Sequence, residues 1–281
     1  MIAPAPGKNW TRAKHPHGLK RAMATKTNDD ADSKMTAVQK AARLLQAIAS
    51  AEEPKSLADL AEQAEMPKPS VHRLLLQLED VGFVQRDLSG RGYTVGASWL
   101  RLSVDALVAQ ARQPIVRGIM QKLVDRVKES CNLSVLQNHE VLYLERVECD
   151  WPLRMQLQSG SRVPIHATAS GKLLIAQMSE KNRRALLNSI HREKFTDTTI
   201  VDLDEMEEEC RLIRKNDLSM NKEEYHRGLI GVSVPLRRSD NTVIATLSIH
   251  APSFRMSVET ALSYAPLLKE SAKEIVAELG L

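Results

Sequence analysis

The order of elements over residues 35–96 constrains the fold most. Apolar residues recur at helical spacing in a first segment, from Val38 to Ile48. A second helix is expected to begin at Ser56, whose hydroxyl can cap it. A third begins with Pro69 at its first position, where a missing N–H costs nothing. We therefore expect three short helices in succession.

A hairpin is expected directly after the third helix, which ends at Gly82. Phe83–Arg86 and Tyr93–Val95 have the composition of strands, and the residues between them favour a turn. Three helices and a hairpin within roughly 60 residues are typical of a winged helix-turn-helix. Residues 97–111 have one apolar face, which predicts a helix that links this domain to the rest of the chain.

The third predicted helix has an apolar back and a polar front. The core side is expected to consist of Val71, Leu74, Leu75 and Leu78. The front suits the major groove of DNA, because Arg73 can bond guanine bidentately and Gln77 can bond adenine. Further contacts, chiefly with the DNA backbone, are expected from Lys68, Ser70 and His72 on this helix and from Arg86 and Arg91 on the wing. A winged helix that contacts only protein is the alternative.

From residue 112 onward helices and strands interleave, which predicts the α+β class. The expected strands are Leu133–Leu136, Val141–Val147, Arg154–Leu157, Gly231–Leu236 and Val243–His250. The expected helices begin at Pro114, follow Ala169, cover residues 181–188 and 204–216, and run from Val258 to the end with a kink at Pro266.

Size and charge are compatible with these two parts. A chain of 281 residues suggests about two domains, 35–96 and 112–281 with the linker helix between them. The formal net charge of +4 permits a nucleic-acid partner without requiring one. No apolar run reaches the roughly 18 residues that a membrane span needs, so we expect no membrane partner.

The three cysteines are scattered, with no zinc spacing, and an odd number does not make a disulfide framework. We therefore expect a cytoplasmic protein with reduced thiols. Residues 1–34 form a basic, polar segment that is expected to be disordered. It could add phosphate contacts, or it could be an inert extension or a misassigned start, with Met23 and Met35 as alternative starts.

Several motifs, spread over about residues 35–280, resemble the IclR family of transcriptional regulators. They are Ser56-Leu-Ala-Asp-Leu-Ala, Pro67-Lys-Pro-Ser-Val-His-Arg-Leu-Leu, Pro164-Ile-His-Ala-Thr-Ala-Ser-Gly-Lys, Glu223-Glu-Tyr-His-Arg-Gly and Gly231-Val-Ser-Val-Pro-Leu. The resemblance implies a GAF-like effector domain, in which a curved antiparallel sheet holds a pocket for a small organic or aromatic acid. It also implies homodimers, or dimers of dimers, on palindromic operators of double-stranded DNA.

The candidate effector site is the start of the helix that follows Thr168. The free backbone N–H groups of Ala169 and Ser170 can bind a carboxylate, and the resemblance implies this role for them. Thr168 could equally be a structural N-cap. The resemblance implies a ligand contact at Asn221. Gly231 stands where many relatives have cysteine, which leaves the identity of the ligand open.

Ser233 and Ser248 lie on expected strands and could face either the pocket or the solvent. His166 lies close to Ser170 in sequence, but no GxSxG elbow precedes the serine and no acid is placed to orient the histidine. The histidines lack HxxxH or HExxH spacing. We therefore expect no catalytic residue, no metal and no cofactor.

Our first hypothesis is allosteric gene regulation, with the effector acting on the winged helices through residues 97–111. Two other hypotheses remain open at this point. One is an enzyme built on the C-terminal domain that turns over a small acid. The other is a binding module with no role at DNA.

Overall fold

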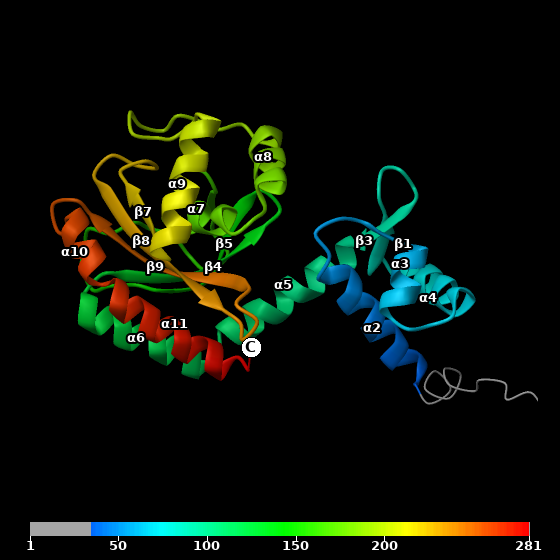
Figure 1. Ribbon diagram of the computed structural model, residues 1–281. Coiled ribbons are helices and arrows are strands. Elements are labelled where there is room, and N and C mark those ends of the chain that lie inside the picture. Colours follow the sequence, from blue (N-terminus) through cyan, green and yellow to red (C-terminus); the bar gives the residue numbers. More distant parts are fainter. Residues whose placement is uncertain (1–34, 281) are drawn as a thin grey trace, which may run out of the picture. The chain divides into compact units, whose positions relative to one another are not determined.

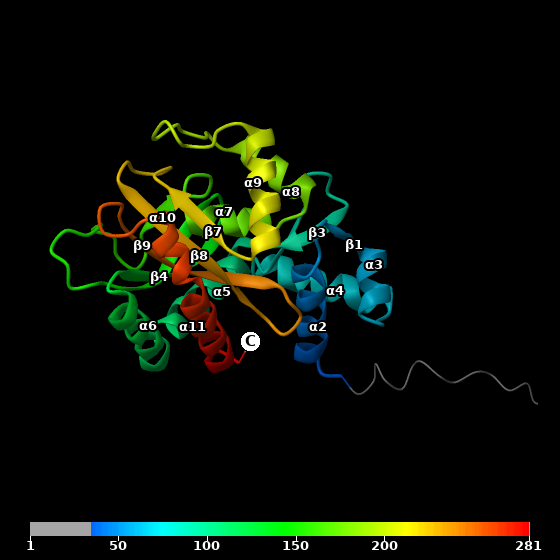
Figure 2. The same cartoon turned by 60° about the vertical axis from the view of Figure 1, so that its left-hand side comes forward.

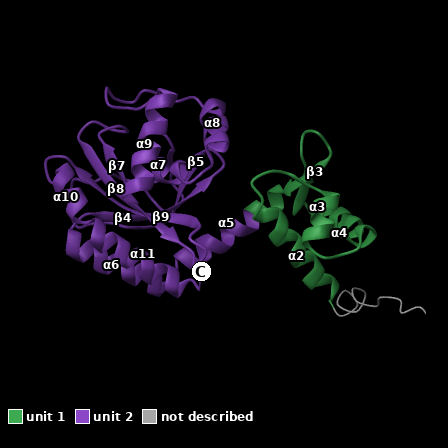
Figure 3. Ribbon diagram, in the orientation of Figure 1, with its two compact units in different colours: residues 1–100 green, residues 101–281 purple. Residues whose placement is uncertain are grey.

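The computed structural model describes residues 35–280. It divides the chain into two compact units, Met1–Leu100 and Arg101–Leu281 (Figure 3). The boundary falls inside one helix, α5 (Ala97–Ala111), whose first turn belongs to the N-terminal unit. The basic tail expected over residues 1–34 lies outside the described residues.

The described residues of the N-terminal unit form helices α2 to α4, the first turn of α5 and a small antiparallel sheet (Figure 1). Its helices are α2 (Ala37–Ala49), α3 (Leu57–Gln63) and α4 (Lys68–Asp80). Its strands are β1 (Lys55–Ser56), β2 (Val84–Arg86) and β3 (Gly92–Val95), in the order β1-β3-β2. The predicted winged helix-turn-helix is confirmed, and the short strand β1 is an addition that the pattern did not predict.

Local chemistry explains where these helices begin. The Ser56 hydroxyl accepts a hydrogen bond from the backbone N–H of Asp59, and the Asp59 carboxylate accepts one from the N–H of Ser56, which completes a capping box. We expected Pro69 at the first position of this helix. Helix α4 instead begins at Lys68, so Pro69 takes the second position. The four apolar residues expected on the back of α4 are all buried in one cluster: Val71, Leu74, Leu75 and Leu78.

The C-terminal unit is built on a six-stranded antiparallel sheet with the order β6-β5-β4-β9-β8-β7. The strands are β4 (Ser130–Gln137), β5 (Glu140–Val147), β6 (Arg162–Pro164), β7 (Ser219–Lys222), β8 (Leu229–Arg237) and β9 (Val243–Pro252). Helices and an antiparallel sheet in one unit confirm the α+β class. No helix in the described part of the chain is long and apolar enough to cross a membrane.

Helices cover both faces of this sheet. Figure 1 and Figure 2 show α6 (Pro114–Val127) and α11 (Ala265–Glu278) on one face, and α7 (Ala169–Ala176) and α9 (Leu203–Asn216) on the other. The remaining helices are α8 (Glu180–Ser189) and α10 (Val258–Ser263). The second half of α5 also packs against the α6 and α11 side through Val104, Leu107 and Val108.

The two faces of the sheet differ in chemistry. Side chains alternate along each strand, and on the face covered by α6 and α11 they are apolar, as at Leu133, Val232 and Ile249. The α7 side of the three central strands carries hydroxyl, amide and imidazole groups, namely Ser130, Asn132, Ser134, Ser233, Thr246, Ser248 and His250. Among the described residues, the hydroxyls of Ser134, Ser219 and Thr246 are buried without a hydrogen-bond partner. Buried polar groups are normally paired, so the unpaired hydroxyls indicate that this face is a candidate ligand site.

Two expectations for the C-terminal unit are wrong. Arg154–Leu157 is not a strand but part of the loop 148–161 between β5 and β6, because no strand pairs with its backbone. The Arg154 side chain bonds the Glu148 carboxylate and the carbonyl of Trp151 within this loop. The terminal helix is not one kinked helix. It is two separate helices, α10 and α11, and Pro266 stands at the start of the second, where proline is tolerated. Strands β6 and β7 were not predicted.

Candidate functional site

The front of α4 is exposed over its whole length. The side chains of Lys68, His72, Arg73 and Gln77 are exposed, and Ser70 is partly buried beside them. Leu76 lies on the same side and is 47% exposed. The structure therefore brings together on one helix face the five polar side chains of α4 that the sequence singled out.

The wing arginine Arg86 is used inside its own domain. Its Nη1 donates to the carbonyl of Gly90 at 3.2 Å, and its Nε lies 3.5 Å from a carboxylate oxygen of Glu79 on α4. Its guanidinium also lies 4.7 Å from the ring centre of Tyr93. These contacts hold the wing hairpin against α4, a structural role that we did not predict.

The tip of the wing is organised by Asp87. One of its carboxylate oxygens accepts from the backbone N–H groups of Arg91 and Gly92, and the other accepts from the hydroxyl of Ser89. These hydrogen bonds, the one from Ser89 first, lower the pKa of the Asp87 carboxyl. The Arg91 side chain itself is exposed at the turn.

A cavity of about 30 Å³ lies between the start of α7, the polar face of the sheet and the loop 148–161. That volume has room for about one water molecule. Its lining is Tyr143, Met155, Leu157, Thr168, Ala169, Ser170, Asn221, Tyr225, Leu229, Gly231, Ser248, Ile249 and His250. Four of the five predicted effector residues line it: Ala169, Ser170, Asn221 and Gly231. The fifth, Ser233, lies directly behind it with its hydroxyl 3.4 Å from that of Ser170. Both Ser233 and Ser248 are buried, so neither faces solvent.

The start of α7 leaves two backbone donors unused. The Thr168 hydroxyl donates to the carbonyl of Pro164 at 2.7 Å and accepts from the N–H of Gly171 at 3.2 Å, so Thr168 is the N-cap. The N–H groups of Ala169 and Ser170 come earlier and have no intrahelical acceptor. Capping and ligand binding are therefore compatible at this helix start.

Gly171 allows α7 to pack directly on the segment before it. A Cβ atom at this position would clash with the backbone carbonyl of Ile165. Gly231 is less constrained, since a Cβ atom there would lie 3.3 Å from the carbonyl oxygen of Ile249. The first glycine is thus needed for packing, and the second leaves room next to the cavity.

A buried ion pair lies one turn into α7. Nζ of Lys172 lies 2.6 Å from Oε1 of Glu224 and 2.8 Å from Oε1 of Glu209. Burial raises the pKa of the Glu224 carboxyl, and the charge of Lys172 opposes that rise. Glu224 also donates its backbone N–H to the side chain of Asn221 at 2.8 Å. The pair therefore fastens the segment after β7 to the effector helix. Both residues lie in the motifs quoted above, but sequence reasoning gave them no role.

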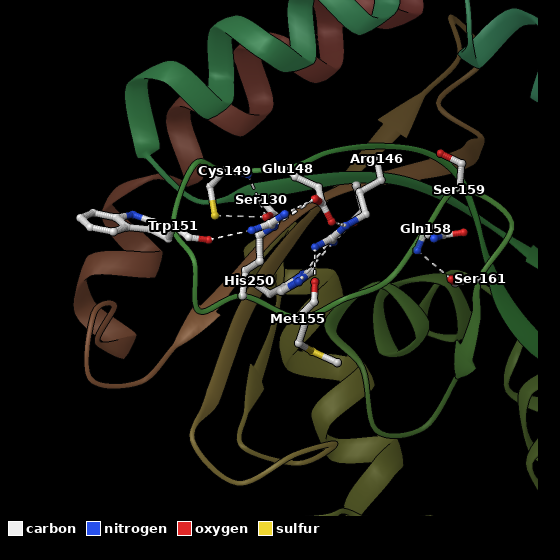
Figure 4. A network of polar contacts seen from close by, with 12 residues as sticks. Ser130, Arg146, Glu148, Cys149, Trp151, Met155, Gln158, Ser159, Ser161 and His250 are labelled. Atoms are coloured by element: carbon white, nitrogen blue, oxygen red, sulfur yellow. Dashed lines mark hydrogen bonds and ion pairs between the residues drawn. The ribbon is translucent and has the colours of Figure 1, made fainter.

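A second polar network adjoins the cavity, and Figure 4 shows it at close range. Nη1 of the buried Arg146 donates to Oδ1 of Asn132 at 2.7 Å, and Nη2 donates to the carbonyl of Met155 at 2.7 Å. Nη1 also lies 3.3 Å from Nε2 of His250. Burial, assisted by the charge of Arg146, lowers the pKa of His250 to about 3, so its imidazole is neutral. Sequence reasoning missed Arg146, which stands beside Glu145 in β5 and meets its partners only through strand pairing.

The serine–histidine pair of the enzyme hypothesis is not assembled. His166 directs Nε2 to the carbonyl of Glu193 at 2.9 Å and stacks on Phe195, whereas the Ser170 hydroxyl faces Ser233. Burial lowers the pKa of His166. In the part of the chain that the structure describes, no group of three or more histidine, cysteine or acidic side chains is placed to hold a metal ion.

Comparison with known families identifies both units. The model of the IclR helix-turn-helix domain matches residues 37–88, and that of the bacterial transcriptional regulator IclR C-terminal domain matches residues 107–277. This chain belongs to the IclR family. IclR proteins are transcriptional regulators that combine a DNA-binding helix-turn-helix with a C-terminal ligand-binding domain. The family assignment made from motifs is confirmed, and the α7 cavity lies in the ligand-binding domain.

Similar proteins agree with this assignment. The protein named "Probable transcriptional regulator SauR" of Cupriavidus necator is 37% identical over 240 residues, which is 85% of this chain and 95% of that protein. The crystal structure of Thermotoga maritima IclR is 26% identical, covers 87% of this chain and 98% of its own, and has a TM-score of 0.57. An IclR homolog from Microbacterium hydrocarbonoxydans, complexed with 4-hydroxybenzoate, is 23% identical with a TM-score of 0.55, covers 87% and 99% respectively, and shows the shared fold.

Proposed function

We propose that this IclR protein represses or activates transcription under the control of a small carboxylic acid. The acid binds at the start of α7 and changes the affinity of the winged helix for its operator. The observation that carries the proposal is the pair of free backbone donors, Ala169 and Ser170, at a cavity lined by buried hydroxyl and amide groups. The active form is a homodimer, or a dimer of dimers, on a palindromic operator.

The exposed front of α4 supports the DNA contact. Its polar side chains lie opposite a buried apolar back, which is the distribution a groove-inserted helix needs. Arg73 and Gln77 contact base edges, while Lys68, Ser70, His72 and Arg91 contact the DNA backbone. Arg86 contacts the DNA backbone as well, while it keeps its contacts with Gly90, Glu79 and Tyr93. Leu76 contacts a thymine methyl group.

Charge and hydrogen bonding support an acid as the effector. The positive end of α7 favours an anion, and Ser170 adds a hydroxyl donor beside the two N–H groups. Apolar side chains such as Met155 and Leu157 would contact the carbon skeleton. Because the cavity is only about 30 Å³, binding displaces these two residues together with the loop 148–161. The effector therefore stabilises the conformation in which the loop 148–161 is displaced.

Helix α5 supports a route between ligand and DNA. It runs unbroken from Ala97 to Ala111, with Trp99 packed in the N-terminal core and Val104, Leu107 and Val108 packed in the C-terminal core. A coupling free energy of about 1–3 kcal/mol through such an element gives about 5- to 150-fold regulation.

The effector site is tested with the Ala169→Pro variant of the full chain. Proline is tolerated at the first helical position, and Thr168 before it already has the extended backbone that proline requires. The variant loses one N–H donor and should bind carboxylic acids at least about tenfold more weakly in thermal-shift titrations, since a hydrogen bond to a charged group contributes about 1.5–3 kcal/mol. Glu180→Pro, the same change at the first position of α8, is the matched control.

The DNA half is tested by footprinting the DNA that flanks the gene of this protein. Arg73→Ala should weaken specific binding by about 10- to 100-fold, since a bidentate base contact contributes about 1–3 kcal/mol. Lys122→Ala, an exposed cation on α6 in the other unit, should leave binding unchanged. A protein that gives no footprint, or one indifferent to Arg73→Ala, would refute the DNA contact proposed for α4.

A further inference from the structure

The network around Arg146 lacks one hydrogen-bond acceptor. Three contacts form a ring: Arg146 to Asn132 at 2.7 Å, Asn132 to His250 at 3.0 Å, and His250 to Arg146 at 3.3 Å. Arginine only donates, so Asn132 accepts through Oδ1 and presents its Nδ2 to His250. Nδ1 of the imidazole must accept from that Nδ2, which leaves Nε2 protonated. The Nε2–H then faces the Nη1–H of Arg146, and two donors meet.

Turning the Asn132 amide does not remove the mismatch. Its Nδ2 would then face Nη1 of Arg146 across the shortest contact of the ring, and His250 would donate to Oδ1. A neutral imidazole offers one acceptor nitrogen and a protonated one offers none, so protonation increases the excess of donors. With the ring nitrogens of His250 placed as they are here, each choice of amide orientation and tautomer leaves one donor–donor contact.

The other groups around Arg146 do not supply the acceptor. Nε of Arg146 lies 3.4 Å from Glu148, whose other carboxylate oxygen is engaged by Arg154 at 2.9 Å. The neighbouring Glu145 is paired with Arg117 at 2.6 Å. Nη2 is capped by a neutral carbonyl, that of Met155. Arg146 is 4% exposed, and its ion-pair partner Glu148 is shared with Arg154, so a further anion at Nη1 would compensate the buried charge more fully.

This donor-rich corner adjoins the effector cavity, and Met155 separates Arg146 from it. His250 lines the cavity from β9, and Met155, which caps Arg146, lines it from the loop 148–161. Ala169 and Ser170 line the same cavity from α7. A displacement of the loop would enlarge the cavity and remove the carbonyl from Arg146 at the same time.

We propose that Arg146 and His250 bind a second anionic group of the effector, which is therefore a short organic acid with two acidic ends. The inference rests on the proposed function, which assigns one carboxylate to the start of α7. An oxygen of the second group accepts from Nη1 of Arg146 and from Nε2–H of His250, and another replaces the Met155 carbonyl on Nη2. The chemistry required is that of an oxyanion: a carboxylate, a sulfonate or a phosphonate.

The ligand preference is tested by calorimetric titration of the full chain with matched acids. Malonate, succinate, sulfoacetate and phosphonoacetate carry two acidic groups, and acetate and propionate carry one. At least one acid of the first set should bind at least about 100-fold more tightly than the second set, because a site built to pair polar groups rejects a ligand that lacks one. The best binder also identifies the type of oxyanion. Equal binding of the two sets would overturn the inference.

The residue assignment is tested with Arg146→Gln and Arg146→Lys, each checked for a native circular dichroism spectrum and cooperative unfolding. Arg146→Gln should reduce the ratio of the affinities for acids with two and with one acidic group to less than about tenfold, and Arg146→Lys should keep part of this preference. A preference that survives Arg146→Gln would overturn the assignment.

A spectroscopic measurement on the unmodified protein guards against variants that fail to fold. With ¹⁵N-labelled histidine, His250 should be a neutral Nε2–H tautomer, and its Nε2 signal should move when the preferred acid binds. An unmoved signal would overturn the inference. If single acids bind and Ala169→Pro weakens them, but no acid with two groups is preferred, the proposed function stands and this inference fails. If none of the six acids binds, this inference fails, whereas the proposed function fails only if aromatic and longer carboxylic acids do not bind either.

Discussion

Lys172 and Glu224 form an ion pair, 2.6 Å long, whose two side chains are only 1% and 5% exposed. It ties the effector helix α7 to the segment that follows β7, and Glu209, more exposed at 24%, completes it. Removing one member of such a pair leaves the other charge buried without compensation.

Lys172→Met should lower the free energy of unfolding by about 3–5 kcal/mol, because Glu224 keeps its burial and loses its cation. Glu224→Gln should cost less, since Lys172 retains Glu209 at 2.8 Å. The double variant Lys172→Met/Glu224→Gln should be more stable than Lys172→Met alone. Urea unfolding of the four proteins gives the comparison, and strictly additive losses would contradict it.

The Lys172→Met variant should also be more stable in mild acid than at neutral pH, relative to the double variant. Burial holds the pKa of Glu224 above its ordinary value of 4.5, and loss of Lys172 removes the main influence that lowers it. A raised pKa in the folded state means that the stabilisation is present below pH 4.5 and is lost as the pH rises through the folded pKa. Unfolding curves between pH 4.5 and 8 measure this slope, and a flat difference would refute it.

Two glycine substitutions should act in opposite directions. Gly171→Ala should destabilise the C-terminal unit by about 1–3 kcal/mol, because its Cβ meets the rigid carbonyl of Ile165. Gly118→Ala, in the middle of α6 with open space around it, should stabilise by about 0.5–1 kcal/mol through helix propensity. Thermal unfolding distinguishes them. A Gly171→Ala protein as stable as the parent would show that α7 can move away from Ile165.

Substitution of the two wing arginines, Arg86 and Arg91, should affect different properties: protein stability for the first and DNA binding for the second. Arg86→Ala should cost about 1 kcal/mol of stability, because it removes the contacts with Tyr93 and with the partly exposed Glu79. Arg91→Ala should leave the free energy of unfolding unchanged. It should reduce the slope of the logarithm of the DNA-binding constant against the logarithm of the salt concentration by about one. Unfolding curves and DNA titrations at several salt concentrations provide both measurements.

His250 should make the C-terminal unit sensitive to acid. Its pKa of about 3 in the folded protein is below the ordinary value of 6.5, so its contribution to stability is present above pH 6.5 and is lost as the pH falls toward 3. His250→Gln should flatten the decline in stability between pH 6.5 and 4. His139→Gln, at an exposed position, is the matched control for the loss of one histidine.

Local patterns predicted the N-terminal unit well. The apolar side chains of α4, the capping serine of α3 and the order of helices and strands depend on residues within a few turns of each other, and all three predictions are confirmed. The failures also have local causes. Alternating apolar residues at Arg154–Leu157 predicted a strand, but no neighbouring strand pairs with them.

The cavity was predicted only in part. The start of α7 is continuous in sequence, so its free N–H groups could be inferred from Thr168 and the small residues after it. The Arg146 network could not be inferred, because Asn132, Arg146 and His250 lie on three different strands and meet only through the register of β4 with β5 and β9. Antiparallel pairing over more than a hundred residues leaves no spacing rule in the sequence.

The two faces of the sheet in the C-terminal unit have different roles. One side supplies the apolar contact with α6 and α11, and the other carries serine, asparagine and histidine beside the cavity. The apolar cluster under α6 and α11 does not depend on the polar side chains that line the cavity. A gene duplicate of this protein could therefore acquire a new effector through a few changes at cavity positions such as Gly231 and Ser248, while that apolar cluster stays intact.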